Sequence, residues 1–196
     1  MNITLKLSKN KENFLEIINN GSVNPFLFRN NKKTIVVIGN LILNNKVISQ
    51  NDGNLIIEII ESRRLDILDG SFLIFFFNKG VGLEIITDRF GSQACYYSLA
   101  GKYLYVSNIA TNIYRMVKDK RLDEYASYEF LYFRRLFSQK TLFKKVRFIE
   151  GALSTVIDYD LKIISSCYWT PNDIKKTKYN KKNISNDIVN LMADSV

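Results

Sequence analysis

Few side chains in this sequence are able to perform catalysis, and their types exclude most familiar hydrolase chemistry. The sequence contains no histidine, so neither a Ser-His-Asp triad nor a Cys-His dyad can form. Its two cysteines, Cys95 and Cys167, are too few for a structural zinc site of four Cys/His ligands. Both lie in mid-chain, and we expect reduced, buried thiols that pack as small hydrophobic side chains. The sequence therefore predicts no catalytic residue and no metal site.

The composition is that of an ordinary globular domain. The chain has 196 residues, of which 46% are hydrophobic and 24% are charged, enough apolar mass for one core. The apolar run Ser71–Phe77 is too short to cross a bilayer as a helix, and Met1–Ser8 lacks the apolar region of a signal peptide. We therefore expect a cytoplasmic protein without a membrane partner.

The net charge of +9 raises the question of nucleic acid, because clustered cations gain affinity by releasing counterions from phosphates. Most of the cations are scattered along the sequence. One dense run lies among Asn and Thr residues after Pro171 and consists of Lys175, Lys176, Lys178, Lys181 and Lys182. This composition is typical of a solvated linker, and we expect no nucleic acid partner.

Periodicity predicts strands and one helix in the first half of the chain. The β-branched run Thr34–Ile38 indicates a buried strand that ends at Gly39. Asp52 is placed to cap a helix over Asn54–Ser62, whose isoleucines fall on one face. A hairpin follows, with strands over Phe72–Phe77 and Leu83–Thr87 joined by Asn78-Lys79-Gly80.

The second half continues the mixture of hairpins and helices. The predicted strands are Tyr103–Ser107, Leu153–Tyr159 and Lys162–Tyr168, and the predicted helices are Asp123–Phe133 and Asn186–Val196. Such an alternation favours an α+β architecture over a doubly wound parallel sheet.

Several short segments follow one another in an order that resembles the glutamine-amidotransferase domain of the asparagine synthetase family. The family strings are "L-x-G-x-F-A-F", "R-D-R-F-G-x-x-P-L-Y-Y", "F-A-S-E-I-K", "L-D", "T-L-F", "P-P-G" and "Y-W". Their counterparts here are Leu68–Phe72, Asp88–Gly91 with Tyr96-Tyr97, Tyr105–Ile109, Leu122-Asp123, Thr141–Phe143, Ile149–Gly151 and Tyr168-Trp169. Each string alone is weak, but their collinear order covers about half of the chain.

The resemblance implies a four-layer αββα sandwich of the N-terminal-nucleophile type, with two antiparallel sheets packed between helices. Alternate residues of Phe72–Phe77 should then face different layers. Gly70, Asp88, Arg89 and Gly91 would be structural residues of the family motifs. We expect Asp88–Gly91 to form a turn in which Phe90 is buried and Gly91 has a backbone conformation that is costly for other residues.

The glutaminase reaction centre of the family is missing from this sequence. Active members carry a cysteine after the initiator Met, and its thiol attacks glutamine with its own α-amine as base. Here the second residue is Asn2, whose amide is not a nucleophile. Gly39 corresponds to the glycine of "N-G-E-I-Y-N", but Ile38 replaces the oxyanion-hole Asn. Asp52 corresponds to the Asp that holds the glutamine amine, so Gly39 and Asp52 are at most a vestigial substrate site.

The second half of the family's chemistry is an ATP-dependent activation of a carboxylate, which uses a "S-G-G-x-D-S" loop bound to ATP and Mg²⁺. No such loop occurs in this sequence, so the chain itself should bind no cofactor. The resemblance predicts a synthetase domain as partner, in the same polypeptide or as a separate chain. It divides the sequence into a degenerate glutaminase-like domain (1–170), a Lys/Asn-rich linker (171–185) and the start of a synthetase-domain helix (186–196).

Three interpretations of function follow. The first is a non-hydrolysing scaffold domain of an amide-forming ligase, as in the family's β-lactam synthetases and lasso-peptide cyclases. The second is a free-standing basic module that binds nucleic acid or a peptide through its 11 Tyr and 13 Phe residues. The third is a fragment of an asparagine synthetase.

Overall fold

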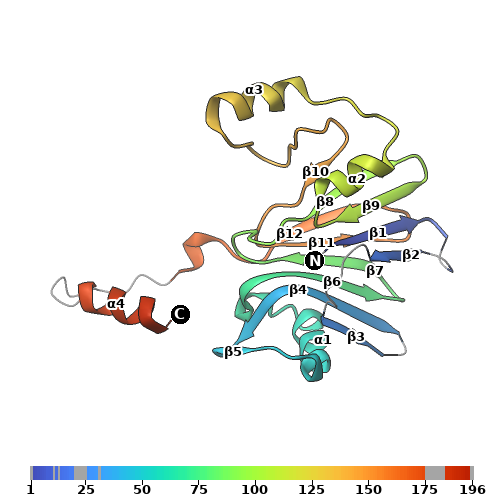
Figure 1. Cartoon of the computed structure of the whole chain (residues 1–196). Coiled ribbons are helices and arrows are strands. Elements are labelled where there is room, and N and C mark those ends of the chain that lie inside the picture. Colours follow the sequence, from blue (N-terminus) through green and yellow to red (C-terminus); the bar gives the residue numbers. More distant parts are fainter. Residues whose placement is uncertain are drawn as a thin grey trace.

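The computed structural model describes residues 2–10, 12, 14–19, 26–30, 32–174 and 184–194. Figure 1 shows two stacked sheets with helices on either side. The strands are β1 (Ile3–Ser8), β2 (Leu15–Asn19), β3 (Phe26–Arg29), β4 (Lys33–Leu43), β5 (Lys46–Val47), β6 (Asp69–Asn78), β7 (Gly82–Thr87), β8 (Tyr96–Ala100), β9 (Tyr103–Ser107), β10 (Arg147–Phe148), β11 (Leu153–Ile157) and β12 (Ile163–Cys167). The helices are η1 (Gln50–Asp52), α1 (Gly53–Glu61), η2 (Leu65–Ile67), α2 (Ala110–Met116), α3 (Glu124–Phe133), η3 (Pro171–Asp173) and α4 (Ile184–Asp194).

All strand pairs in both sheets are antiparallel. The larger sheet has the order β12-β11-β7-β6-β4-β3, with β5 paired to β4, and the smaller sheet has the order β10-β8-β9-β1-β2. The predicted hairpin is β6–β7, in which Phe77 pairs with Leu83. The predicted terminal hairpin is β11–β12.

Strand β6 shows why the sheets stack. Its residues Phe72, Ile74 and Phe76 join the apolar cluster beneath α1. Leu73, Phe75 and Phe77 belong instead to the cluster between the two sheets. Alternate side chains thus supply both cores, because successive side chains of a strand point to opposite faces. This confirms the alternation predicted from the sequence.

The layers are completed by one helix on each outer side (Figure 1). Helix α1 covers the outer face of the larger sheet with Ile56, Ile59 and Ile60, which are fully buried. Helix α2 covers the smaller sheet, where Ile113 and Val117 pack on side chains of β8 and β9. The order helix, sheet, sheet, helix is the four-layer αββα sandwich that was predicted from the sequence.

Helix α3 begins where the sequence predicts. The side chain of Asp123 accepts a hydrogen bond from the Ala126 amide at 3.0 Å, which satisfies one of the free amides of the first turn. In Figure 1, α3 lies beyond α2, farther from the two sheets. Ala126 is its buried residue, so α3 contributes little to the cores described above.

Some local predictions were wrong. Strand β4 does not end at Gly39 but continues to Leu43, because Gly39 adopts a φ of +87° that lets the backbone of β6 approach closely. Asp52 occupies the N-cap position of α1, but its carboxylate accepts no hydrogen bond from the amides of that helix and accepts from the Ser49 amide and hydroxyl instead. Strands β1, β2, β3 and β8 and helix α2 had not been predicted as elements.

The C-terminal part of the structure does not test the domain boundaries expected after residues 170 and 185, which stay a prediction. Helix α4 overlaps the predicted helix and begins at Ile184, two residues before the expected start. Most of the Lys/Asn-rich linker lies outside the described residues. Within the described parts of the chain, no helix has the length and apolar character that a membrane crossing requires.

Candidate functional site

Two of the predicted residues, Gly39 and Gly70, lie at one end of the β4–β6 pair. Gly39 lies opposite Phe72, and Gly70 lies opposite Leu41 in the register of the two strands. Both glycines have positive φ, and a Cβ on Gly39 would lie 2.2 Å from the Ser71 carbonyl oxygen. Glycine is therefore required at Gly39 by the close approach of two backbones.

A glutamine that sequence reasoning missed completes this end of the strands. The side chain of Gln93 lies beside Gly39, and its Nε2 donates a hydrogen bond to Ser71 Oγ at 2.9 Å. Gln93 falls at a variable position of the string that matches Asp88–Gly91 and Tyr96-Tyr97, so the resemblance assigned it no role. It presents an amide at the position where the resemblance implies a vestigial substrate pocket.

Asp88 is the centre of the loop that follows β7. Its carboxylate is fully buried and accepts hydrogen bonds from the amides of Phe90 (2.9 Å), Ser92 (3.1 Å) and Gln93 (3.2 Å) and from the Ser92 hydroxyl (3.0 Å). Its carbonyl oxygen accepts from the amides of Gly91 and Ala152. A buried carboxylate with this many donors fixes the loop conformation.

Arg89 and Gly91 extend the same loop toward its neighbours. Arg89 donates to the Asp66 carbonyl oxygen at 2.7 Å and lies over the Trp169 ring, 5.5 Å from its centroid. Gly91 has a φ of +64°, as predicted, and its backbone touches Gly151, where a Cβ would lie 2.5 Å from the Gly91 nitrogen. The strings around Asp88, Gly151 and Trp169 therefore form one assembly in space.

The prediction that Phe90 is buried was wrong, because its side chain is 81% exposed. Its amide is held by Asp88, which leaves the ring outside the loop, in edge contact with Trp169 at 5.7 Å between centroids. We expected an aromatic residue in this turn to be buried. The loop geometry instead directs the ring outward.

Asp52 is engaged in a local turn. Its carboxylate accepts hydrogen bonds from the Ser49 amide (2.9 Å) and the Ser49 hydroxyl (2.7 Å). These bonds hold the pKa of Asp52 below its usual range. The structure thus joins Gly39, Gly70 and the Asp88 loop, and gives Asp52 the role of closing the turn before α1.

The two cysteines lie in different environments. Cys95 is fully buried in the core between the sheets, and burial raises the pKa of its thiol, which disfavours the reactive thiolate. Cys167 is exposed, contrary to the prediction, because β12 lies at the edge of its sheet. Both thiols are free, as expected.

The start of β1 is anchored by polar groups that the sequence analysis did not identify. The Ile3 amide donates to Asn108 Oδ1 at 2.9 Å, and the Ser107 hydroxyl donates to the Ile3 carbonyl at 2.7 Å. Thr4 contacts Ser107 and the Asn112 amide through its hydroxyl. The hydroxyl and amide side chains of this cluster are not bases near neutral pH, so they offer nothing that would activate a nucleophile.

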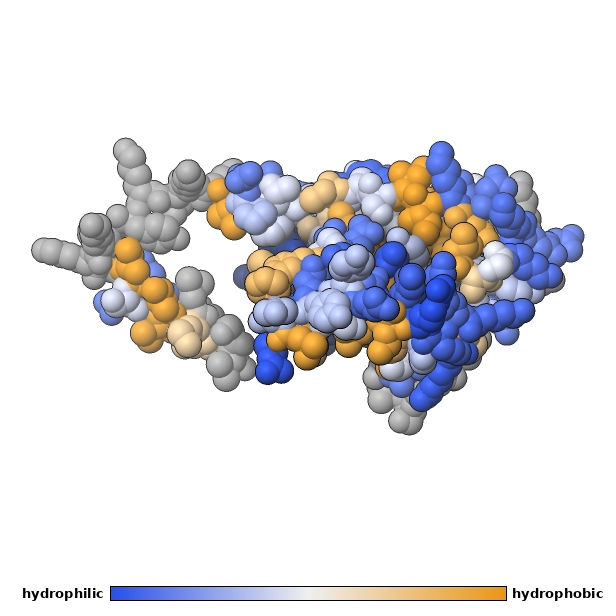
Figure 2. Space-filling view, turned by 90° about the horizontal axis from the view of Figure 1, so that it is seen from above, coloured by the Kyte–Doolittle hydropathy of each residue, from blue (hydrophilic) through white to orange (hydrophobic). Residues whose placement is uncertain are grey.

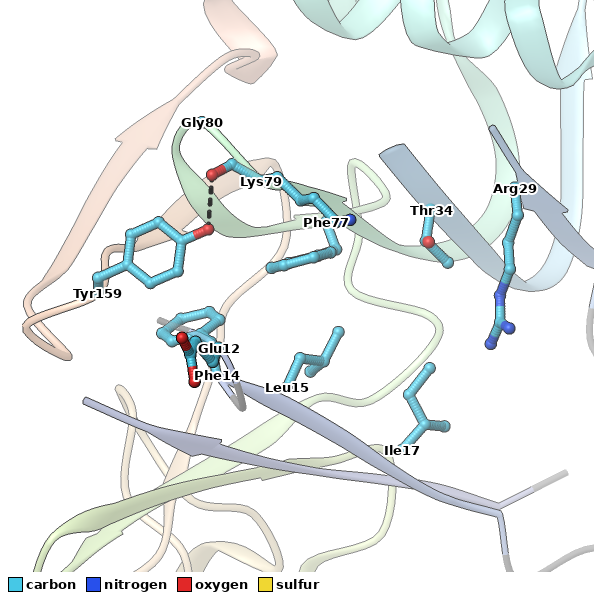
Figure 3. A pocket seen from close by; sticks show the side chains of 10 residues that line it. All are labelled: Glu12, Phe14, Leu15, Ile17, Arg29, Thr34, Phe77, Lys79, Gly80 and Tyr159. Atoms are coloured by element: carbon cyan, nitrogen blue, oxygen red, sulfur yellow. Dashed lines mark hydrogen bonds between the residues drawn. The ribbon is translucent and has the colours of Figure 1, made fainter. Parts of the chain in front are cut away.

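A cavity of about 750 Å³ opens between the sheets at the other end of β4, where Thr34 lies (Figure 3). Its lining is apolar in the middle and charged at the edge, and consists of Glu12, Phe14, Leu15, Ile17, Arg29, Thr34, Phe77, Lys79, Gly80 and Tyr159. The Tyr159 hydroxyl donates to the Lys79 carbonyl oxygen at 2.7 Å, as the dashed line in Figure 3 shows. None of these lining residues is a histidine or a cysteine.

Among the described residues, no group of three His, Cys, Asp or Glu side chains gathers as a metal ion would require. The buried Glu84 is paired with Arg63 and accepts a hydrogen bond from Ser154. Its carboxylate is thus occupied by structural partners.

Comparisons with known proteins identify no family by sequence. No family model matches the chain, and no curated protein matches it. Glutamine phosphoribosylpyrophosphate amidotransferase from B. subtilis, solved with ADP and GMP, is similar in structure over 86% of this chain and 43% of its own, with 12% identity and a TM-score of 0.49. A structure of the allosteric regulatory enzyme of purine biosynthesis is similar over 76% and 31%, with 14% identity and a TM-score of 0.47.

This chain therefore spans less than half the length of either solved protein. Both TM-scores lie below 0.5, so neither similarity identifies the function of this chain. The fold class is defined by the sheets and helices described above.

Proposed function

We propose that this chain is a glutamine-amidotransferase-like domain of an asparagine-synthetase-related, ATP-dependent amide-forming ligase, in which the glutaminase activity has been lost. Its role would be to support a synthetase half, in the same polypeptide or as a separate cytoplasmic chain. ATP and Mg²⁺ would bind to that half.

The observation that supports this proposal most is the assembly around Asp88. The family-like segments Asp88–Gly91, Ile149–Gly151 and Tyr168-Trp169 lie far apart in sequence but contact one another in one loop system of an αββα sandwich. Segments that matched the family strings by chance would have no reason to meet in space.

The loss of activity rests on chemistry at two positions. Asn2 stands where active members have the cysteine nucleophile, and a carboxamide cannot attack glutamine. Ile38 stands where they have an oxyanion donor, and its side chain is buried in the core between the sheets. Loss of one such donor typically lowers the rate about 10²–10³-fold.

A coupled glutamate assay tests the proposal on the wild type and on Asn2→Cys. We expect no release of glutamate by either protein, with mass spectrometry reporting whether Met1 has been removed. Turnover by the wild type would contradict the scaffold role. Turnover by Asn2→Cys alone would show that the substrate pocket survives and that only the nucleophile is missing.

The synthetase partner needs its own test. A pyrophosphate-loop protein encoded beside this chain should bind it in calorimetric titration, whereas ATP with Mg²⁺ should give no heat with this chain alone. Micromolar ATP binding by the isolated chain would contradict the proposed division of labour.

A free-standing basic binding module is the second candidate. It is favoured by the exposed aromatic side chains of α3, which lie next to Arg134 and Arg135. Fluorescence anisotropy with a single-stranded oligonucleotide distinguishes the candidates, since this module would bind at physiological salt and a ligase scaffold would not.

A further inference from the structure

Helix α3 leaves most of its large apolar side chains exposed to solvent. Apart from Ala126, its apolar residues stay in solvent. The exposed fractions are 80% for Tyr125, 61% for Tyr128, 40% for Phe130, 65% for Leu131, 83% for Tyr132 and 61% for Phe133. Figure 2 looks down on this side of the molecule and shows hydrophobic side chains interspersed with hydrophilic ones. Exposed large apolar side chains concentrated on one short helix indicate an interaction surface.

The helix is held in place and is not a loose end. Before the helix, the Asp123 amide donates to the Leu142 carbonyl oxygen at 2.9 Å. Behind it, Lys140 forms an ion pair with Glu129 at 3.1 Å, and the Phe137 amide donates to the same carboxylate. An interface on α3 would therefore be preorganised, which lowers the entropic cost of binding.

The outer stripe of α3 has complementary ends. Glu124, Tyr128 and Leu131 recur at intervals of four and three residues, so they share one helical face. The acidic residue stands in the first turn, and the basic residues Arg134 and Arg135 follow the last turn. The apolar residues lie between the two charged ends.

This pattern is symmetric about the midpoint between Glu129 and Phe130. Glu124 and Arg135 are equally far from that midpoint, and so are Tyr128 and Leu131. A second α3 laid antiparallel across the first would bring each acidic end to a basic end and each Tyr128 to a Leu131. An isologous interface requires this kind of self-complementarity.

We infer that α3 is the docking surface for a second copy of this chain, with the two helices antiparallel about a two-fold axis. The apolar side chains at the centre of α3 would be buried in this interface. Leu122 and Phe137, which are 57% and 40% exposed before and after the helix, would add apolar area to it. The charges at the ends set the direction of the helices and the register. This dimer is independent of the proposed ligase role.

The symmetry favours a second copy over nucleic acid. A phosphate backbone would gain from Arg134 and Arg135 but would be repelled by Asp123 and Glu124 at the other end of the same helix. A second copy satisfies both ends at once.

Sedimentation equilibrium of the full chain tests the dimer, with a charge exchange as the decisive comparison. We expect Glu124→Arg and Arg135→Glu each to raise the dimer dissociation constant at least about tenfold, because each places like charges opposite one another. The double variant Glu124→Arg/Arg135→Glu restores both pairs and should return the constant to within about threefold of the wild type.

The apolar centre is tested by Leu131→Asp, which should also raise the dissociation constant at least about tenfold. Leu99→Asp is the matched control, since Leu99 is 59% exposed on β8, and it should leave the constant unchanged. A wild type that stays monomeric up to about 1 mM, or a double variant no tighter than the single ones, would overturn the inference.

Cross-linking reports the direction of the helices. In a Cys167→Ser background, chains with Tyr128→Cys and chains with Leu131→Cys should form a disulfide mainly when mixed, as the antiparallel register requires. Efficient cross-linking within each chain type alone would indicate a parallel pair and would contradict the proposed arrangement.

Discussion

Helices α1 and α3 are similar in length and lie on opposite outer sides of the molecule, yet they use their apolar residues in opposite ways. In α1, Ile56 and Ile59 fall on one face and are at most 1% exposed. In α3, the apolar residues Phe130–Phe133 are consecutive, so they point in all directions around the helix. No single surface can bury such a run. The spacing of apolar residues, rather than their number, therefore decides which helix becomes a layer of the fold.

The largest expected effect tests this contrast directly. Ile59→Ala should lower the free energy of unfolding by about 2–5 kcal/mol, because it leaves a cavity between α1 and the larger sheet. Leu131→Ala on α3 is the matched substitution, and it should change the value by less than about 0.5 kcal/mol in a solution dilute enough for a monomer. Chemical denaturation measures both variants. Equal losses would show that α3 belongs to the core after all.

A second, intermediate effect concerns the loop assembly around Asp88, Gly151 and Trp169. Gly91→Val should destabilise the protein by about 1–3 kcal/mol, because Gly91 combines a φ of +64° with close contact to Gly151. Gly101→Val is the control, since Gly101 has the same φ but no atom within 4 Å of an added Cβ. Thermal unfolding should place Gly91→Val below Gly101→Val. Indistinguishable melting temperatures would mean that the contact with Gly151 is unimportant.

The smallest expected effect is at the N-terminus of α3. Asp123→Ala removes the hydrogen bond to the Ala126 amide and should cost about 1 kcal/mol. Because α3 contributes little to the cores, we expect the loss as faster hydrogen exchange within 124–133, with global unfolding nearly unchanged. Asp123→Asn, which keeps a capping oxygen, should exchange like the wild type. A full loss in global stability would show that α3 and the sandwich unfold together.

The parts of the fold that the sequence predicted are those in which local pattern and final environment agree. The hairpin β6–β7 was predicted because Phe72–Phe77 is a β-forming run next to a turn at Asn78-Lys79-Gly80. The helix predicted over Asp123–Phe133 corresponds to α3, whose N-cap is Asp123, and a cap acts within four residues. In contrast, β1 and β8 were not predicted, although each forms a hairpin with the next strand, β2 and β9. Each also pairs with a strand far away in sequence, β9 for β1 and β10 for β8, which local pattern does not reveal.

The candidate site was harder to predict than the fold. The resemblance identified Gly70, Asp88, Arg89 and Gly91, and the structure brings them to one region. It did not identify Gln93, because a side chain amide facing Gly39 and Ser71 depends on how two distant segments meet. The vestigial substrate site at Gly39 and Asp52 stays a prediction.

The position of β1 has a consequence for how the chain is built during synthesis. Strand β1 lies in the interior of the smaller sheet, between β2 and β9. The Ile3 amide finds its partner Asn108 only 105 residues later in the sequence. While the ribosome makes the intervening strands, β1 can pair with β2 alone, and an isolated two-stranded hairpin is marginal in water. The smaller sheet therefore closes late, after β9 emerges, and until then the apolar face of β6–β7 that it will cover stays uncovered.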